Sequence, residues 1–410
     1  MRPSPAPPDL QLLQGGQDFF PALIQAMDQA VSWIQLETYI FDVHGKGRDV
    51  AEALIRAAGR GVTVQVLVDG IGSGILNPEW HEKIRAAGVQ WCVYSPLGTR
   101  LGGLGLLRPD RWRRLHRKLC VVDQRIVFCG GINVLDDFYD PNHGDLPAPR
   151  FDFAVAVVGP LAVDAADAVA LLWWRVQAGY SARQRHLTAA WEKFKAAGYG
   201  GRTNATKLEA SAGVGLGSPG ARTALVLRDN LRNRSSIEKA YLQAIGQARQ
   251  DILIANAYFV PGGELRRALI AAARRGVKVT LLLQGKYEYF MQYHAARPVY
   301  DALLKVGIEI HEYEASFLHA KVAVIDGYWA TVGSSNLDPL SLLLAREANV
   351  VVEDVDFAQT LRDRLQTAIA SQGRRIDVAA YGRRPLQQRL LGWAAYALMR
   401  TAIWITGQRY

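Results

Sequence analysis

Two short segments, far apart in the chain, carry the same reactive side chains at the same spacing. Each reads HxKx4D, followed six residues later by a small Gly/Ser turn and an asparagine. The residues are His116, Lys118, Asp123 and Asn133 in the first segment, and His319, Lys321, Asp326 and Asn336 in the second. A histidine and a lysine two residues apart on a strand project from one face. One such set beside a phosphate is half of a site, and two sets together surround one phosphorus atom.

Two imidazoles and two ammonium groups are sufficient for phosphodiester chemistry without a metal or another cofactor. One imidazole attacks phosphorus and forms a phosphohistidine. The other, protonated, gives its proton to the leaving alkoxide, while the lysines neutralise the non-bridging oxygens. The remaining histidines show no metal-ligand spacing such as HExxH, and we expect structural or surface roles for all of them. They are His44, His81, His143, His186, His294 and His311.

The segments that must position these groups also occur twice. The strand-like run 34–41 resembles 252–259. The run 53–62, a helix that closes at a glycine before a β-rich segment, resembles 268–277. Strands that alternate with helices predict an α/β fold with mostly parallel sheets covered by helices. The sequence therefore predicts two copies of one α/β unit, the alternative being two unrelated units of similar composition.

The domain boundaries follow from this repeat. We expect an N-terminal tail at 1–14, a first domain at 15–195, and a glycine-rich linker at 196–222. The second domain is expected at 223–372, followed by a basic and apolar C-terminal segment at 373–410.

Composition restricts the class of protein. Of 410 residues, 50% are hydrophobic and 21% charged, which is typical of globular chains and excludes wholesale disorder or a collagen-like repeat. Three cysteines without a CxxC pair predict neither a disulfide framework nor a structural zinc site. The formal charge of +10 favours an anionic partner, either nucleic acid or an anionic membrane surface.

The paired motif resembles the phospholipase D superfamily. That resemblance implies two α/β domains related by a pseudo-twofold axis, one shared site and a covalent phosphohistidine, with His116 as nucleophile and His319 as acid. The run 333–342, the segment 257–261 and the compact size make the chain most similar to bacterial cardiolipin synthases that lack N-terminal membrane spans.

The resemblance also implies an acidic residue after each turn that orients a catalytic histidine. Asp152 and Glu347 match that position, the alternative for each being a solvated carboxylate at a strand edge. Within the motif, Asp123 and Asp326 are expected to fix loop geometry more than to take part in chemistry. The chain departs from the family at Ala345, where cardiolipin synthases often carry asparagine.

Two segments outside the motif favour lipid over nucleic acid. The stretch 96–114 combines leucines, arginines and one tryptophan, which suits the headgroup region of a bilayer better than a base-stacking channel. The segment 386–406 is an expected aromatic-rich helix behind a basic flank, suited to the plane of an anionic membrane. Its alternative is a core helix that packs on the second domain.

No run of 18 apolar residues occurs, and residues 1–8 lack the apolar stretch of a signal peptide. The sequence thus predicts a peripheral enzyme at the cytoplasmic face of the bacterial membrane. We expect it to make cardiolipin by phosphatidyl transfer from phosphatidylglycerol to a lipid headgroup hydroxyl. The alternatives are a phospholipase D that uses water and a nuclease of the same superfamily. The acceptor lipid, acyl preference and oligomeric state stay open.

Overall fold

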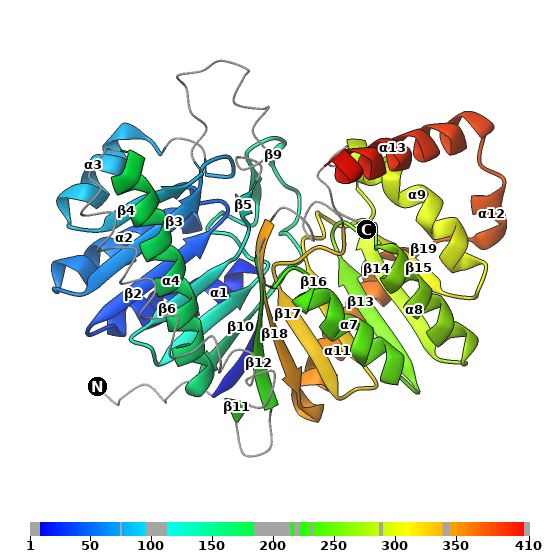
Figure 1. The fold of residues 1–410 in the computed structure, drawn as a ribbon, viewed down its shortest axis with the longest axis horizontal. Coiled ribbons are helices and arrows are strands. Elements are labelled where there is room, and N and C mark those ends of the chain that lie inside the picture. Colours follow the sequence, from blue (N-terminus) through cyan, green and yellow to red (C-terminus); the bar gives the residue numbers. More distant parts are fainter. Residues whose placement is uncertain are drawn as a thin grey trace.

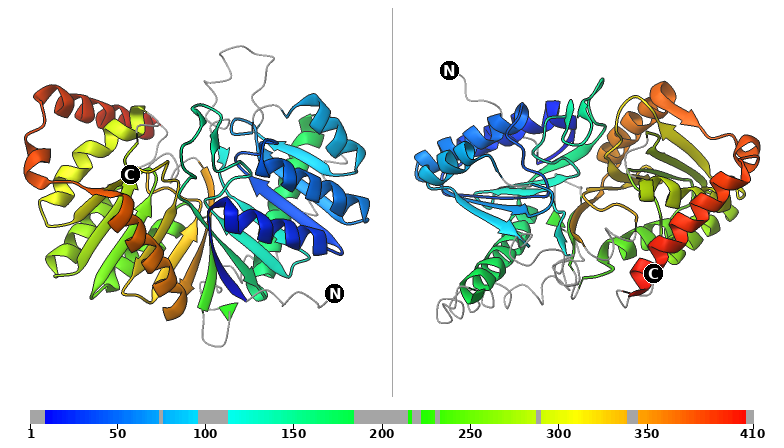
Figure 2. Two further views of the ribbon diagram at one scale, coloured as in Figure 1. Left: turned by 180° about the vertical axis from the view of Figure 1, so that it is seen from behind. Right: turned by 90° about the horizontal axis from the view of Figure 1, so that it is seen from above.

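The computed structural model describes residues 9–73, 76–95, 113–183, 215–216, 222–229, 233–286, 290–338 and 345–405. Within these ranges the chain forms two α/β halves that lie side by side, each built on one large sheet with helices on both faces (Figure 1; Figure 2). A small hairpin, β8 (Tyr139–Asp140) with β9 (Gly144–Asp145), stands beside the junction of the halves.

The first sheet has the strand order β1-β10-β7-β6-β2-β3-β4. Its strands are β1 (Leu10–Gln14), β2 (Trp33–Thr38), β3 (Thr63–Asp69), β4 (Gln90–Tyr94), β6 (Leu119–Val122), β7 (Ile126–Gly130) and β10 (Phe153–Val158). Its helices are α1 (Gly15–Gln29), α2 (Lys46–Gly59), α3 (Pro78–Ala86) and α4 (Pro160–Arg183). Helices α1 and α2 pack on one face, and α4 packs on the other.

The second sheet has the order β11-β12-β18-β17-β16-β13-β14-β15-β19. Its strands are β11 (Gly215–Leu216), β12 (Arg222–Arg228), β13 (Asp251–Asn256), β14 (Lys278–Gln284), β15 (Glu309–Tyr313), β16 (Lys321–Ile325), β17 (Trp329–Gly333), β18 (Ala345–Glu353) and β19 (Gly373–Arg375). Its helices are α7 (Ser236–Gln247), α8 (Gly263–Arg274), α9 (Phe290–Leu304), α11 (Val355–Gln372), α12 (Val378–Gly382) and α13 (Leu386–Ile405).

One hydrophobic core is shared by the two halves. Val155 of β10 and Val350 of β18 are both fully buried in a single cluster that also contains residues of α4 and α11. Burying a valine or leucine side chain contributes about 1.5–3 kcal/mol, so this cluster holds the halves together firmly. A further strand, β5 (Arg114–Leu115), leaves the first half and pairs with β18 of the second. A site at this junction therefore has rigid walls.

The prediction of mostly parallel sheets was wrong. In the first sheet, only β2, β3 and β4 pair in parallel. In the second sheet, the parallel pairs are β13 with β14, β14 with β15, and β18 with the attached strand β5. The other pairs are antiparallel, because after β4 and β15 the chain continues through hairpins rather than crossover helices. Asp123, Gln124, Asp326 and Gly327 all have positive φ, as the tight turns of such hairpins require.

The limits assigned to both termini also need correction. Residues 10–14, expected in an N-terminal tail, form β1 and pair with β10 along their whole length. Residues 373–375, expected in the C-terminal segment, form β19 at the edge of the second sheet. Most of the expected linker 196–222, and the loop 96–114 except its last two residues, lie outside the described residues.

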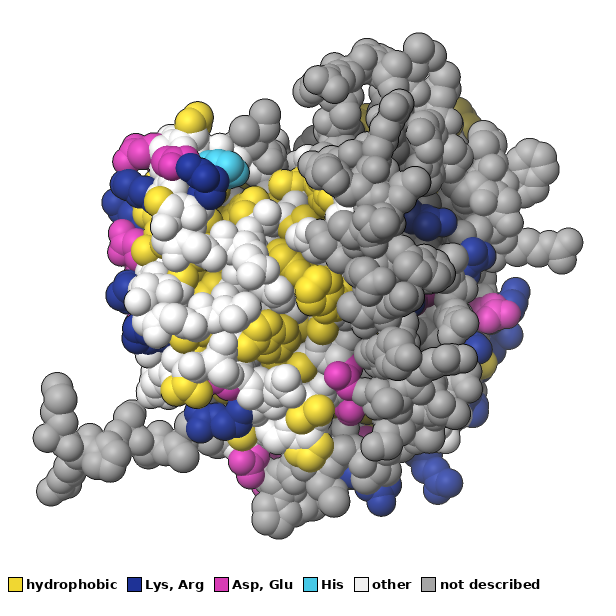
Figure 3. Space-filling model, turned by 60° about the vertical axis from the view of Figure 1, so that its left-hand side comes forward, with side chains coloured by type: hydrophobic (Ala, Val, Ile, Leu, Met, Phe, Trp, Pro, Cys, Tyr) yellow, Lys and Arg dark blue, Asp and Glu magenta, His cyan; other side chains and the backbone are white. Residues whose placement is uncertain are grey.

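Helix α4 carries the aromatic run for which a core position was the preferred interpretation. Leu172 and Trp173 are buried against Leu67 and Leu115, whereas Trp174 is 37% exposed. The space-filling view of this side of the molecule shows hydrophobic side chains gathered at its centre with charged ones toward the rim (Figure 3).

Candidate active site

The two motif histidines each pair with a carboxylate from the opposite half. His116 Nδ1 lies 2.9 and 3.1 Å from the two carboxylate oxygens of Glu347. His319 Nδ1 lies 2.7 Å from Asp152 Oδ2. Both carboxylates are buried, at 0% and 2% exposure, so neither is a solvated strand-edge group. The two halves therefore form one site. Each half supplies one catalytic imidazole and the carboxylate that orients the imidazole of the other half.

Backbone pairing between the halves explains this crossing. The amide of His116 donates to the carbonyl of Arg346 at 3.0 Å, directly before Glu347. In the matching place, the amide of His319 donates to the carbonyl of Phe151 at 2.9 Å, directly before Asp152. At the start of each motif, the histidine amide thus hydrogen-bonds to the backbone of the other half, directly before the carboxylate residue.

The motif lysines are buried beside their own histidines. Lys118 and Lys321 are 5% and 0% exposed. The Lys118 Nζ donates to the His116 carbonyl at 2.8 Å, and the Lys321 Nζ donates to the His319 carbonyl. Burial lowers the pKa of Lys118 to about 7, because desolvation disfavours its charged form. A phosphate between the lysines would restore that charge.

The two histidine–carboxylate pairs differ electrostatically. Burial lowers the pKa of His116, and the Glu347 carboxylate partly offsets this effect. Burial and the nearby lysines lower the pKa of His319 well below its usual value. Burial raises the pKa of Asp152 to about 7. The Asp152–His319 pair thus retains one shared proton up to about neutral pH, which suits a group that must donate a proton.

Asp123 and Asp326 do not belong with the reacting groups, and their place among the candidate catalytic residues is corrected. The carboxylate of Asp123 accepts from the amides of residues 31–33 at 2.8–2.9 Å. That of Asp326 accepts from the amides of residues 249–251 at 2.8–3.0 Å. Each sits five residues beyond its lysine at the far end of a strand, about 16 Å along at 3.3 Å per residue. They fix the loops that start β2 and β13.

The asparagines of the motif shape the turns beneath the histidines. Asn133 is 8% exposed, and its Oδ1 accepts from the amide of Ile40 at 3.2 Å. Asn336 is 3% exposed in the matching turn of the second half, next to Leu337, whose amide donates to Asn256 Oδ1 at 3.1 Å. Asn133 thus holds the segment at Ile40, and Asn336 is buried in the matching turn of the second half.

Two residues beside the histidines were missed by sequence reasoning. The Tyr39 ring lies 5.0 Å from the His116 ring and 5.4 Å from the Lys118 Nζ. The Ser334 hydroxyl donates to Glu347 Oε2 at 2.5 Å. Tyr39 lies within the strand-like run 34–41, directly after β2, and Ser334 belongs to the Gly/Ser turn of the motif, so both positions could have been interpreted as supports.

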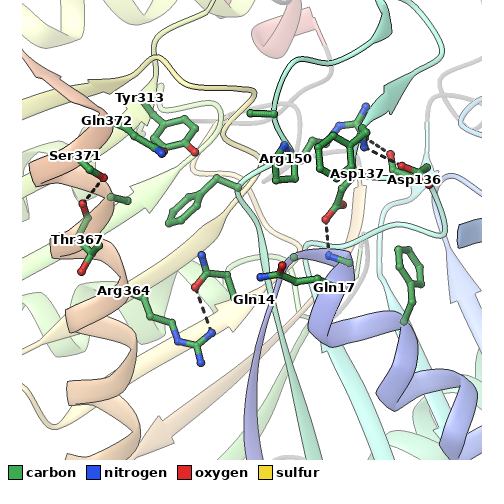
Figure 4. Close-up of a pocket in the computed structure, with 18 of the residues that line it drawn as sticks. Gln14, Gln17, Asp136, Asp137, Arg150, Tyr313, Arg364, Thr367, Ser371 and Gln372 are labelled. Carbon is green, nitrogen blue, oxygen red and sulfur yellow. Dashed lines mark hydrogen bonds between the residues drawn. The ribbon is translucent and has the colours of Figure 1, made fainter. Parts of the chain in front are cut away.

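A cavity of about 570 Å³ lies between the halves, separate from the catalytic side chains (Figure 4). Its lining includes Asp137 and Arg364, and it does not include the motif histidines or lysines. At its wall, Asp137 accepts from the amide of Gly16 at 2.5 Å, and the amide of Gly15 donates to the Asp152 carbonyl at 2.9 Å. The start of α1 thus supports Asp152 from behind.

Comparison with known proteins gives a consistent result. The family model described as "Cardiolipin synthase, PLD-like domain" matches residues 23–143 and 241–369. The chain is 38% identical over 380 residues to cardiolipin synthase B of Escherichia coli K12, with 90% of this chain and 82% of the relative covered. It is 30% identical over 384 residues to cardiolipin synthase A of Cronobacter sakazakii, with 93% and 73% covered.

Among solved structures, the fold resembles phosphatidylserine synthase of Haemophilus influenzae Rd KW20, with a TM-score of 0.66 and 13% identity. That match covers 97% of this chain and 94% of the other. Both motifs fall inside the regions that the family model matches. The chain belongs to the cardiolipin synthase family with phospholipase D-like domains.

Proposed function

We propose that this chain is a phosphatidyltransferase that forms cardiolipin, with phosphatidylglycerol as donor and a lipid headgroup hydroxyl as acceptor. The observation that carries the proposal is the crossed pairing of His116 with Glu347 and of His319 with Asp152. Such pairing provides one imidazole for attack and another for proton transfer on opposite sides of a phosphorus atom. The names of the relatives support lipid as the substrate.

In the first step, the Nε2 lone pair of His116 attacks phosphorus. The bond between phosphorus and the headgroup oxygen breaks, and the proton held by the Asp152–His319 pair goes to that oxygen, so glycerol leaves as a neutral alcohol. Lys118 and Lys321 stabilise the charge that develops on the non-bridging oxygens. Glu347 stabilises the positive charge on the His116 ring.

In the second step, the roles of the second imidazole reverse. His319 takes the proton from the acceptor hydroxyl, and the resulting oxygen attacks the phosphohistidine. The phosphorus–nitrogen bond breaks and its electron pair returns to His116. Atoms balance: two phospholipids enter, and cardiolipin and one glycerol leave.

Helix α13 supplies the feature that suits a membrane surface. Ala395 and Met399 pack into the core of the second half, so the core-helix interpretation applies to that face. The opposite face exposes leucines and a tryptophan to solvent: Leu386 at 68%, Leu390 at 60%, Trp393 at 54% and Leu398 at 60%. Within the described ranges, none of the helices is long and apolar enough to cross a bilayer.

We infer that this exposed face inserts into the headgroup region of the cytoplasmic leaflet, with Arg389 and Arg400 near lipid phosphates. Figure 1 shows α13 at the same upper end of the molecule as β5, which leads into His116. The Leu390→Gln/Trp393→Gln/Leu398→Gln variant should lose binding to phosphatidylglycerol vesicles while keeping the melting temperature of the parent. Normal vesicle binding by this variant would assign the face to another role.

The direct test of activity uses purified protein and labelled phosphatidylglycerol in mixed micelles. We expect cardiolipin and free glycerol in equal amounts. Phosphatidic acid as the main product would identify a hydrolase, and cleavage of DNA without lipid turnover would identify a nuclease.

A further inference from the structure

The carboxylates that orient the two histidines have different neighbours on the adjoining strand. Glu347 of β18 lies directly opposite Arg228 of β12 in the antiparallel register of these two strands. Residues that lie directly opposite one another in such a pair project from the same face of the sheet. The Arg228 side chain therefore leaves β12 on the face from which Glu347 reaches His116.

The first half has no counterpart of this arginine. Its matching strand pair is β1 with β10, in which Gln14 pairs with Phe153. The next residues along, Gly15 and Asp152, lie opposite each other, and the amide of Gly15 donates to the Asp152 carbonyl at 2.9 Å. The same strand pair thus forms with a glycine in the position of Arg228, so the fold does not require a cation there.

Arg228 is held in a fixed position inside the protein. Its side chain is only 2% exposed. Its Nη1 donates to the Ala345 carbonyl at the start of β18, and its Nε donates to the Arg234 carbonyl at 3.0 Å. Burying a guanidinium costs free energy unless other groups compensate its charge, and a cost that the fold does not require points to a function.

Glu347 is the group that compensates this charge most. Burial lowers the pKa of Arg228 to about 10, and of the carboxylates that offset this effect, Glu347 has the largest influence. Arg228 therefore stays charged near neutral pH. Its positive charge acts in turn on the carboxylate that orients His116.

The other groups around the His116–Glu347 pair do not replace this cation. Lys118 also acts on Glu347, but burial lowers its pKa to about 7, and in the proposed mechanism its charge serves the substrate phosphate. Tyr39 and Cys129 are neutral, because burial raises the pKa of each. The remaining charged groups are Lys321, which acts on His116, and Asp229, Glu238 and Asp338, which act on Arg228. Arg228 is thus a permanent cation beside Glu347, independent of the substrate.

An extra proton on the His116–Glu347 pair slows the first step. A proton on Nε2 occupies the lone pair that attacks phosphorus, and a proton on Glu347 removes the negative charge that stabilises the ring after attack. A permanent cation beside the pair disfavours the uptake of such a proton. The Asp152–His319 pair, which has glycine in the matching place, keeps a proton up to about pH 7.

We propose that Arg228 is a positioning residue for the nucleophile, which acts through Glu347 and keeps His116 ready to attack. This inference rests on the proposed phosphatidyl transfer and deepens it. The presence of arginine at one strand pair and of glycine at the other then decides which histidine is the nucleophile and which is the acid.

The test follows the first chemical step alone. With a phosphatidyl donor that has a p-nitrophenol leaving group no acid is needed, so the rate constant of the p-nitrophenol burst reports on the His116–Glu347 pair. It is measured as a function of pH for the parent, for Arg228→Gln and Arg228→Met, which remove the charge, and for Arg228→Lys, which keeps it. Arg222→Gln is the matched control, because Arg222 lies opposite Glu353 on the same two strands, exposed and at the other end of β12.

In the parent, the rate constant should fall only below about pH 6.5, the ordinary imidazole value, because burial lowers the pKa of His116. In the two neutral variants the fall should begin about one pH unit higher or more, since loss of a nearby cation shifts proton uptake by about 1–3 units. At higher pH their rate constants should approach that of the parent. Arg228→Lys and Arg222→Gln should follow the parent throughout.

Incomplete folding of a variant does not alter this result, because the rate constant of a burst is a property of the active molecules. A profile of the parent's shape in either neutral variant, including an equal loss of rate at every pH, would overturn the role of Arg228, since a merely structural arginine would have that effect. A shift in Arg228→Lys as large as in Arg228→Gln would also overturn it. Absence of a burst from the parent enzyme would instead overturn the proposed function.

Discussion

The two half-sites share one backbone frame but hold their histidines in different ways. In one, the longer side chain of Glu347 reaches His116 and is itself held by the Ser334 hydroxyl. In the other, Asp152 reaches His319 and lies against Gly131, where an added Cβ would come within 2.2 Å of its carboxylate. The duplicated unit has therefore diverged at the carboxylate and at its neighbour together.

This difference shows how the two copies of a duplicated unit can give their histidines different roles, one as nucleophile and one as acid. Asp152 is buried against backbone and keeps a proton to about pH 7, so its pair with His319 is suited to donate. The carboxylate beside His116 is Glu347, which also accepts from the Ser334 hydroxyl. Because this donor stabilises the ionised carboxylate, His116 is suited to carry positive charge after attack. Four sets of changes test this comparison, in descending order of expected effect.

The largest effect is expected from the histidines. His116→Asn and His319→Asn should each reduce cardiolipin formation by about four orders of magnitude or more, as losses of groups that act as a unit do. Steady-state assays on phosphatidylglycerol micelles measure this. His81→Asn, at a surface position on α3, serves as the control. More than a few per cent of parent activity in either motif variant contradicts a shared site.

The lysines should have a smaller but large effect. Lys118→Ala and Lys321→Ala each remove one cation beside the phosphate, with an expected loss of about 10²–10³ in kcat. Lys83→Ala, on the exposed face of α3, controls for net charge. If only one of the two lysines mattered, the phosphate would be bound by one half alone, contrary to the symmetric arrangement of both.

The pH profile should show the proton of the Asp152–His319 pair. That proton is present below about pH 7 and lost above it, so kcat/KM should fall as the pH rises through about 7. Lys118, whose pKa is also about 7, loses its charge in the same range. In Lys118→Arg the side chain stays charged, so the fall of kcat/KM near pH 7 should remain, because it is due to Asp152. In Asp152→Asn that fall should disappear. A profile identical to the parent in Asp152→Asn contradicts the role of the pair.

Chelation should have the smallest effect. Lys118 and Lys321 supply the positive charge that a metal provides in other phosphoryl-transfer sites. EDTA should therefore leave the rate on detergent-dispersed substrate within about twofold of the parent. Loss of activity that a single divalent ion restores would show that the lysines are insufficient.

Much of the site could be predicted because it is local in sequence. The His–Lys spacing, the Gly/Ser turn and the repeated flanking segments each fall within a few residues, and they identified both half-sites. The crossing of Glu347 to His116 and of Asp152 to His319 could not be predicted, because it depends on β5 pairing with β18 of the other half. Spacing alone does not say which strands become neighbours.

The errors in the predicted fold have specific causes. The hairpins that make the sheets mixed turn at Asp123–Gln124 and at Asp326–Gly327, and an Asp-Gly pair is itself a hairpin signal. Both aspartates were expected to fix loop geometry, but the hairpins that such turns imply were not predicted. Helix α13 was ambiguous because one face packs in the core and the other is exposed, and a pattern of apolar residues does not separate these faces.

The most direct test of the central claim separates the nucleophile from the acid. A phosphatidyl donor with a p-nitrophenol leaving group needs no acid, because p-nitrophenolate leaves unprotonated. His319→Asn should then release a burst of p-nitrophenol equal to the enzyme present, and mass spectrometry should find the phosphatidyl group on His116. His116→Asn should give neither burst nor adduct. An adduct on His319 in the His116→Asn variant would contradict the assignment of roles to the two halves.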